Sequence, residues 1–229
     1  MKKLYAAVGL FKLCSNDKKE VYPSVILSGN ECKLDIQEMT VWASLNWSIL
    51  GFEQLKEHYS EQESKFDFIC SRSFENTLNR LCVRGLVAEG TGETDEEALY
   101  NLISKLYVVP LYQSAFIRTI SFLKLILIHK ISYNKAKAVF EIDRKTREEK
   151  RIMKLAFSAP MSTAEIIKCV DKNISCILSE DDVVEFLYDD AELTSENISE
   201  TTRYLPVTRS VISAISNLYL RKQILFERV

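Results

Sequence analysis

One pattern occurs twice in this chain and constrains its fold more than any other feature. Residues 77–89 (TLNRLCVRGLVAE) and residues 214–227 (AISNLYLRKQILFE) each carry Leu and Ile at helical spacing, then a basic residue, then a short apolar run. This spacing predicts an amphipathic helix that ends near the basic residue and turns sharply into a short strand. A helix–turn–strand unit that occurs twice predicts two similar modules.

Length and composition agree with two modules. A chain of 229 residues has room for two units of about 80 to 110 residues each. Only four Pro and six Gly are present, which is too few for long disordered linkers or for an all-β fold rich in turns. We therefore expect a mainly α fold with short β strands, of the α+β class.

The first module is predicted to span residues 1–110 and to begin with a β-hairpin. The runs 4–13 and 21–27 are rich in β-forming residues and are separated by a polar turn at 15–19. Pro23 has no N–H to donate, so it predicts an edge position for the second strand. The expected order is a hairpin followed by helices.

Three helices should follow the hairpin. Asp35 and Glu38 have the spacing of a capping box, which opens a helix to about residue 47. A second helix is predicted over 52–61, and a third begins at Ser73-Phe74 with Phe74, Leu78 and Leu81 on its inner face. A short strand at 86–88 and a tight turn at 90–92 complete this module, and a further helix is expected from Thr94.

A helical connector is predicted over residues 111–144 and a second, divergent module over 145–229. One constant offset along the sequence aligns Val41 with Ile152 and Leu55 with Ile166, which indicates a duplication. Ser162 and Glu165 form another capping box. An acidic insertion at 179–199, with a helix at 181–188, should precede a last helix that begins at Pro206 and a closing strand at 224–226.

The connector is apolar on more than one side, so it needs partners on several faces. Burial between the two modules is one interpretation, and the seam of a homodimer is the alternative.

Charge is unevenly distributed along the sequence. Residues 111–160 hold 11 Lys and Arg against 4 Asp and Glu, whereas residues 161–202 hold 2 against 11. Such segregation permits local binding of phosphate despite a net charge of -2.

Several classes of function have no support in the sequence. The two His lie outside any catalytic or metal-binding motif, and no phosphate-binding or dinucleotide-binding glycine pattern occurs, so we expect no enzyme, no cofactor and no metal. The Cys spacings are typical of reduced thiols. The apolar run 120–128 is interrupted by Lys124 and is too short to span a membrane. A cytoplasmic protein is expected.

The element order over residues 35–92, with the motif Leu78-xx-Leu81-xx-Arg84-Gly85-Leu86-Val87, resembles bacterial winged-helix transcription regulators in a tandem form. Residues 145–229 resemble the same family less specifically. The resemblance implies recognition of double-stranded DNA by the third helix of each module, and a homodimer. Since a helix is expected where a second wing strand would stand, the wing is predicted to be short or absent.

Exposed polar residues of the two third helices are the predicted DNA contacts. Asn pairs with adenine and Arg with guanine, while nearby cations neutralise phosphates. The first set is Arg72, Ser73, Asn76, Asn79, Arg80 and Arg84, and the second is Arg203, Thr208, Arg209, Ser213, Ser216, Asn217, Arg221 and Lys222. Three alternatives stay open: a solvated helix face, a winged-helix scaffold or adaptor with a protein partner, and a plasmid-type replication initiator.

Overall fold

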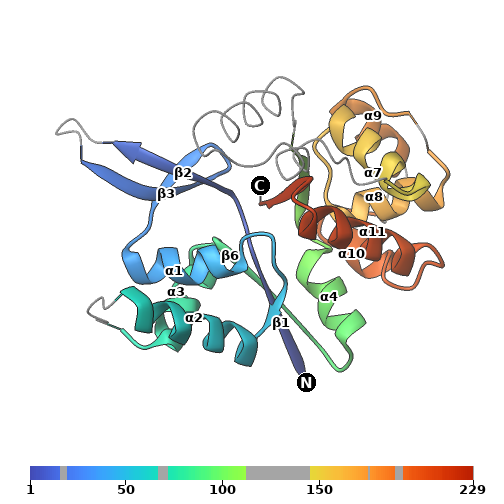
Figure 1. Cartoon of the computed structure of the whole chain (residues 1–229). Helices are drawn as coiled ribbons and strands as arrows, with labels where there is room; N and C mark the ends of the chain where they lie inside the picture. Colours follow the sequence, from blue (N-terminus) through green and yellow to red (C-terminus); the bar gives the residue numbers. More distant parts are fainter. Residues whose placement is uncertain (16–19, 67–71, 112–144, 175, 189–192, 229) are drawn as a thin grey trace, which may run out of the picture.

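The computed structural model describes residues 1–15, 20–66, 72–111, 145–174, 176–188 and 193–228. The described chain combines helices with short strands, so the predicted α+β class is confirmed. Figure 1 shows strand β1 (Lys2–Ala7) with three helices on one side of it and the remaining helices on the other. Within these residues, none of the helices has the length and hydrophobicity needed to cross a bilayer.

The N-terminal half, residues 2–92, packs three helices against a small sheet. These helices are α1 (Ile36–Leu45), α2 (Phe52–Phe66) and α3 (Phe74–Val83). The sheet has the order β5-β1-β6, where β5 is Leu50–Gly51 and β6 is Val87–Gly92, and β1 is antiparallel to both neighbours. The predicted inner faces are confirmed because the following apolar side chains are all buried: Val41, Leu45, Leu55, Phe74, Leu78 and Leu81.

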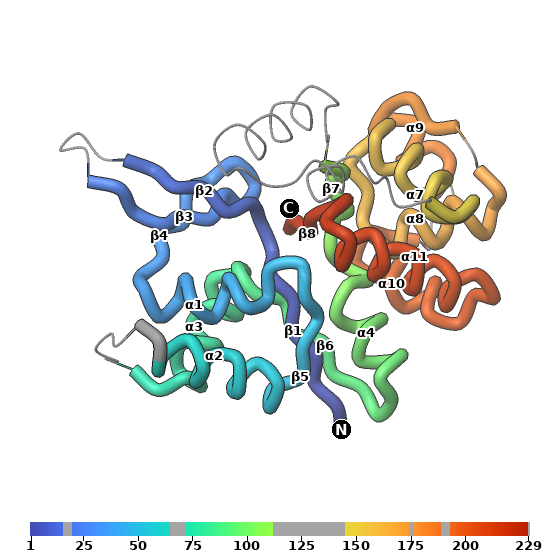
Figure 2. Tube along the Cα trace, in the orientation of Figure 1, coloured from blue at the N-terminus to red at the C-terminus, as the bar shows by residue number. Residues whose placement is uncertain are grey.

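A separate sheet projects from this half (Figures 1 and 2). It has the order β2-β3-β4, formed by Leu10–Ser15, Val21–Leu27 and Asn30–Lys33. The predicted strand 4–13 is thus two strands, because Gly9 (φ 89°) turns the chain between β1 and β2. The edge position predicted for Pro23 is wrong, since β3 is the central strand. The β4 ladder begins only at Ser24, so β4 does not run beside the proline.

The tight turn predicted at residues 90–92 is also wrong, because these residues belong to β6. Helix α4 (Asp95–Ile103) packs directly on the strand. A Cβ atom at Gly90 would lie 2.3 Å from the carbonyl oxygen of Ala98, so glycine is required for this close approach. Helix α4 then leads into β7 (Tyr107–Pro110), which lies within the predicted first module but pairs with the last strand, β8 (Ile224–Glu227).

The C-terminal half, residues 107–227, repeats the arrangement of the first. Its helices are α7 (Arg147–Ser158), α8 (Thr163–Asp171) and α11 (Thr208–Leu220), and the shorter α9 (Glu180–Leu187) and α10 (Ile198–Thr201) lie between α8 and α11 in the chain. Strand β7 lies between β8 and the segment before α8, where Tyr107 bridges to Ser162. Each half therefore places the strand that precedes its helices at the centre.

The match between the halves extends to single residues. Helices α1 and α2 begin at 36 and 52, and α7 and α8 begin at 147 and 163, so one and the same offset relates both pairs of helix starts. The C-caps of α3 and α11, Arg84 and Arg221, are separated by a larger offset. This increase reflects the α9–α10 insertion, which has no counterpart in the described N-terminal half.

The core of the C-terminal half extends to β1 of the N-terminal half, which also has a core of its own. Ala6 and Val8 belong to the same buried cluster as Ile215 and other residues of the C-terminal half. The hydroxyl of Tyr219 accepts the backbone N–H of Trp47 at 3.2 Å and lies 3.0 Å from the carbonyl oxygen of Leu45. The predicted connector, 111–144, lies outside the described residues except for Leu111, so its burial between the modules and the alternative of a homodimer seam both stay predictions.

Candidate nucleic-acid interface

Helix α3 has one face in the core and one face in solvent. It begins at Ser73, whose hydroxyl accepts the backbone N–H of Asn76 at 3.2 Å. Burial of Phe74, Leu78 and Leu81 leaves Asn76, Asn79 and Arg80 on the outer face, and all three are exposed. Ser73 therefore caps the helix, and the other three residues are accessible to a partner.

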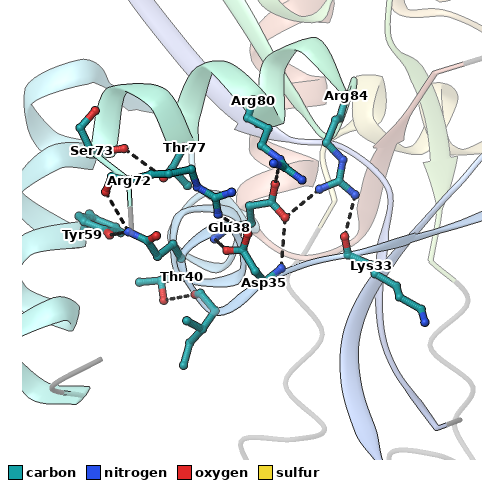
Figure 3. Close-up of polar contacts among 12 residues, drawn as sticks. Lys33, Asp35, Glu38, Thr40, Tyr59, Arg72, Ser73, Thr77, Arg80 and Arg84 are labelled. Carbon is teal, nitrogen blue, oxygen red and sulfur yellow. Dashed lines mark hydrogen bonds and ion pairs between the residues drawn. The ribbon is translucent and has the colours of Figure 1, made fainter. Parts of the chain in front are cut away.

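A buried glutamate of α1 organises the basic residues at the end of α3 (Figure 3). Glu38 is 1% exposed and completes the predicted capping box with Asp35. Its Oε1 atom lies 2.7 Å from Nε of Arg80, and its Oε2 atom lies 2.8 Å from Nη1 of Arg84. One carboxylate thus fixes two guanidinium groups of α3, one helical turn apart.

Two of the predicted phosphate contacts act mainly within the protein. Arg84 also donates to the carbonyl oxygen of Lys33 at 2.7 Å, and Arg72 forms an ion pair with Asp35. The side chains of Arg72 and Arg84 are each 26% exposed, against 54% for Arg80. Arg80 is therefore the most accessible of the three cations. The capping box predicted the position of Glu38 but not its arginine partners, which come from another helix.

Helix α11 presents its predicted DNA face to α4. Thr208 and Ser216 are buried, so the prediction that they point outward is wrong. The hydroxyl of Thr208 donates to the carbonyl oxygen of Thr202. Arg209, Ser213 and Asn217 are exposed, but together with α4 they line a groove of about 700 Å³. The outer face of α11 is one wall of that groove.

The opposite wall of the groove is acidic. The first turn of α4 carries Asp95, Glu96 and Glu97. Arg209 forms an ion pair with Glu96, and Arg203 lies 3.3 Å from Glu97. The cations predicted to contact phosphate are thus opposed by carboxylates from a distant part of the chain. Sequence reasoning missed this because the acids belong to another helix.

The two remaining predicted residues hold the end of α11. Arg221 forms an ion pair with Glu149, which is 1% exposed and lies at the third position of α7 in a capping box with Thr146. This pair corresponds to Arg84 and Glu38 in the N-terminal half. Lys222 takes a left-handed backbone conformation (φ 59°) after the helix, and its ammonium lies 5.4 Å from the ring centroid of Trp47.

The structure does not gather the two predicted sets on one surface. Figures 1 and 2 show α3 and α11 well apart, with β1 between them. The three arginines of the α3 set form ion pairs at the start of α1 (Figure 3), whereas Arg203, Arg209, Ser213 and Asn217 of the α11 set line the groove beside α4. The two sets are therefore separate candidate surfaces that differ in accessibility.

The described residues offer little for other chemistry. No cluster of three or more His, Cys, Asp or Glu suited to a metal ion occurs among them. Burial raises the pKa of the Cys82 thiol to about 11, which disfavours the reactive thiolate. The half-buried Cys82 packs against the core of the N-terminal half, as a small apolar side chain would.

Comparisons of the chain with protein-family models, with curated proteins and with solved structures found no significant match.

Proposed function

We propose that the protein binds double-stranded DNA through the outer face of α3. The observation that carries the proposal is the exposure of Asn76, Asn79 and Arg80 on a helix whose other face is fixed in the core. Asn and Arg are the side chains that pair in bidentate fashion with adenine and guanine in the major groove. A rigid helix that presents both types is suited to reading base edges.

The order of elements supports a winged-helix interpretation of the N-terminal half. Helix, strand, two helices and strand follow one another from α1 to β6, and the sheet order is β5-β1-β6. In a winged helix, the strand after the third helix is followed by the wing and then by another strand of the same sheet. In this half, β1 takes the place of that other strand in the sheet, although β1 precedes the helices in the chain. The third helix of such modules enters the major groove, and α3 has that position in the order.

Glu38 prepares Arg80 for this role. Its carboxylate binds Nε of the guanidinium at 2.7 Å, and no described residue pairs with the two Nη groups. This ion pair restrains the guanidinium through one atom and leaves its two Nη groups available for other acceptors. A preorganised side chain loses less conformational entropy on binding.

We propose one reading helix per chain. The acidic turn of α4 beside α11 repels phosphate, so the C-terminal half is assigned a different role. A homodimer of such chains would present two α3 helices to two half-sites, as expected for a cytoplasmic transcription regulator.

Gel retardation of a mixed-sequence duplex by the purified protein tests the proposal. Retention at micromolar protein in about 50 mM salt should weaken steeply as salt rises, because bound counterions are released. The double variant Asn79→Ala/Arg80→Ala should weaken retention at least tenfold. Arg209→Ala removes an exposed cation from α11 and serves as the matched control, which should bind like the parent protein.

An adaptor is the second candidate, and the groove between α4 and α11 favours it. Apolar residues Leu99, Leu205 and Ile212 line the groove, and both signs of charge lie at its sides. Failure of the folded protein to retain DNA at low salt would overturn the proposal and leave the adaptor. Equal losses for the α3 double variant and for Arg209→Ala would overturn the assignment to α3.

A further inference from the structure

Three capping boxes of this protein place a buried glutamate at the third position of a helix. Glu38 in α1 is paired with two arginines, and Glu149 in α7 is paired with Arg221. Glu165 in α8 is 7% exposed, yet no Lys or Arg among the described residues forms an ion pair with it. Two of these buried charges are compensated by a cation, and the third is not.

The hydrogen bonds of Glu165 satisfy its oxygens but supply no positive charge. Oε2 accepts the backbone N–H of Ser162 at 2.7 Å, and Oε1 accepts the hydroxyl of Tyr188 at 2.7 Å. The amino end of α8 gives a partial positive charge at this position. A carboxylate with so little exposure demands a counter-charge when it is ionised, and the described residues supply none by an ion pair.

Helix capping does not explain why this position carries a charge. The offset that relates the starts of α2 and α8 places Glu165 opposite Gln54 at the start of α2. Gln54 accepts the backbone N–H of Gly51 at 3.1 Å through its neutral amide. The same bond is thus made without a charge in the N-terminal half, so the charge of Glu165 serves something other than the cap.

A cavity of about 430 Å³ adjoins this carboxylate. It lies at the start of α8, between the end of α4 and the α9–α10 insertion, and Ser104, Tyr107, Tyr188 and Ser199 contribute to its lining. Burial, and next the bond to Glu165, raises the pKa of Tyr188, so its hydroxyl stays neutral. The exposed Lys105 and Glu196 also line the cavity with opposite charges.

We propose that this cavity binds an alkylammonium group, with Glu165 as its counter-ion. A carboxylate and several hydroxyl oxygens match the three donors of an ammonium. The rings of Tyr107 and Tyr188 add faces on which a cation is stabilised. Much of the cavity wall comes from the insertion that distinguishes the C-terminal half, so the site is specific to that half and independent of DNA binding.

Titration of the full-length protein with n-butylammonium chloride tests the site, with butan-1-ol as the neutral isostere and ionic strength held constant. NMR signals of the Tyr107 and Tyr188 rings should shift saturably with the amine and not with the alcohol. Glu165→Gln, which keeps the capping acceptor as Gln54 does, should weaken binding roughly tenfold or more. Glu185→Gln removes one exposed charge from α9 outside the cavity and should bind like the parent protein.

The ammonium group has two possible sources, a free amine or a lysine side chain of a partner. The peptide acetyl-Gly-Lys-Gly-amide distinguishes them, since tighter binding than butylammonium identifies a lysine, and equal or weaker binding identifies a free amine. The absence of saturable shifts with both probes would overturn the proposal. So would unchanged binding by a folded Glu165→Gln variant, or equal binding of the alcohol.

Discussion

The N-terminal and C-terminal halves fix their third helices in the same way but expose different sides of them. In each half, an arginine at the end of that helix pairs with a buried glutamate of the first helix, Arg84 with Glu38 and Arg221 with Glu149. The outer face of α3 is then open to solvent, whereas the outer face of α11 faces α4. The same arrangement of helices in the two halves therefore does not imply that the two halves have the same function.

The outer faces of α3 and α11 differ because additional helices lie beside the C-terminal half. Helix α4 follows β6 and packs on the C-terminal half, where it supplies acidic residues beside α11. The α9–α10 insertion covers the start of α8 and leaves Glu165 beside a cavity. No corresponding elements cover α1, α2 or α3 in the described chain. Additions to one copy thus convert one surface into an interface and create a new cavity.

The largest expected effect concerns the contact between β6 and α4. Gly90→Ala places a Cβ atom 2.3 Å from backbone atoms of Ala98 and Leu102, so strand and helix must separate. We expect a loss of about 3 kcal/mol or more in the free energy of unfolding. Urea unfolding measures it, and Gly51→Ala, where the nearest atoms would lie 3.7 Å from the new Cβ atom, controls for the loss of a glycine. Equal losses of stability at the two positions would show that the close contact of β6 with α4 does not require a glycine.

The next effect separates the two buried glutamates. Arg221→Met leaves Glu149, which is 1% exposed, without a cation, and should cost about 2 kcal/mol because Arg221 itself is partly solvated. Arg84→Met should cost roughly half as much, since Arg80 still pairs with Glu38. Chemical unfolding of both variants and of the parent protein measures the two costs. Equal costs would break the comparison, because they would mean that Arg80 does not compensate Glu38.

A smaller effect is expected at the contact between the halves. Tyr219→Phe removes the acceptor of the backbone N–H of Trp47 and should lower the free energy of unfolding by about 1.5 kcal/mol. Burial raises the pKa of Tyr219 above its usual value of 10, so the unfolded chain ionises first as pH rises. Stability from this tyrosine is therefore full below pH 10 and is lost above it. Between pH 8 and pH 11, the free energy of unfolding should fall less steeply with pH for the variant than for the parent protein. Equal slopes for the two proteins would contradict the prediction.

The smallest effects have opposite signs in the two halves. Gly85 and Lys222 occupy the same left-handed position after α3 and α11, with φ of 74° and 59°. Gly85→Ala should destabilise the protein by about 1 kcal/mol, and Lys222→Gly should stabilise it by a similar amount. Differential scanning calorimetry measures both. A destabilised Lys222→Gly variant would show that the contact of the lysine with Trp47 outweighs backbone strain.

Local features of both halves were predictable from the sequence. The capping boxes at Asp35 and Ser162 open helices where expected, and the apolar spacing of 74–81 and 211–218 identifies the buried sides of α3 and α11. The exposed candidates Asn76, Asn79 and Arg80 follow from the same spacing. The partners of Glu38 and the acidic wall beside α11 were not predictable, since each joins residues from separate elements.

The helix starts at the capping boxes, the buried sides of the helices and the repeated helix–turn–strand unit were determined by the sequence alone, because caps and helical periodicity involve residues only a few positions apart. The predicted start of the last helix at Pro206 is wrong, since α11 begins at Thr208 without a side-chain cap. The pairing of β1 with β6, the tight contact of Gly90 with α4 and the groove between α4 and α11 were decided only by the tertiary structure. These features depend on which surfaces meet after the chain has folded. A helix of given amphipathic pattern can therefore present a solvent-exposed outer face in one half and form a groove wall in the other.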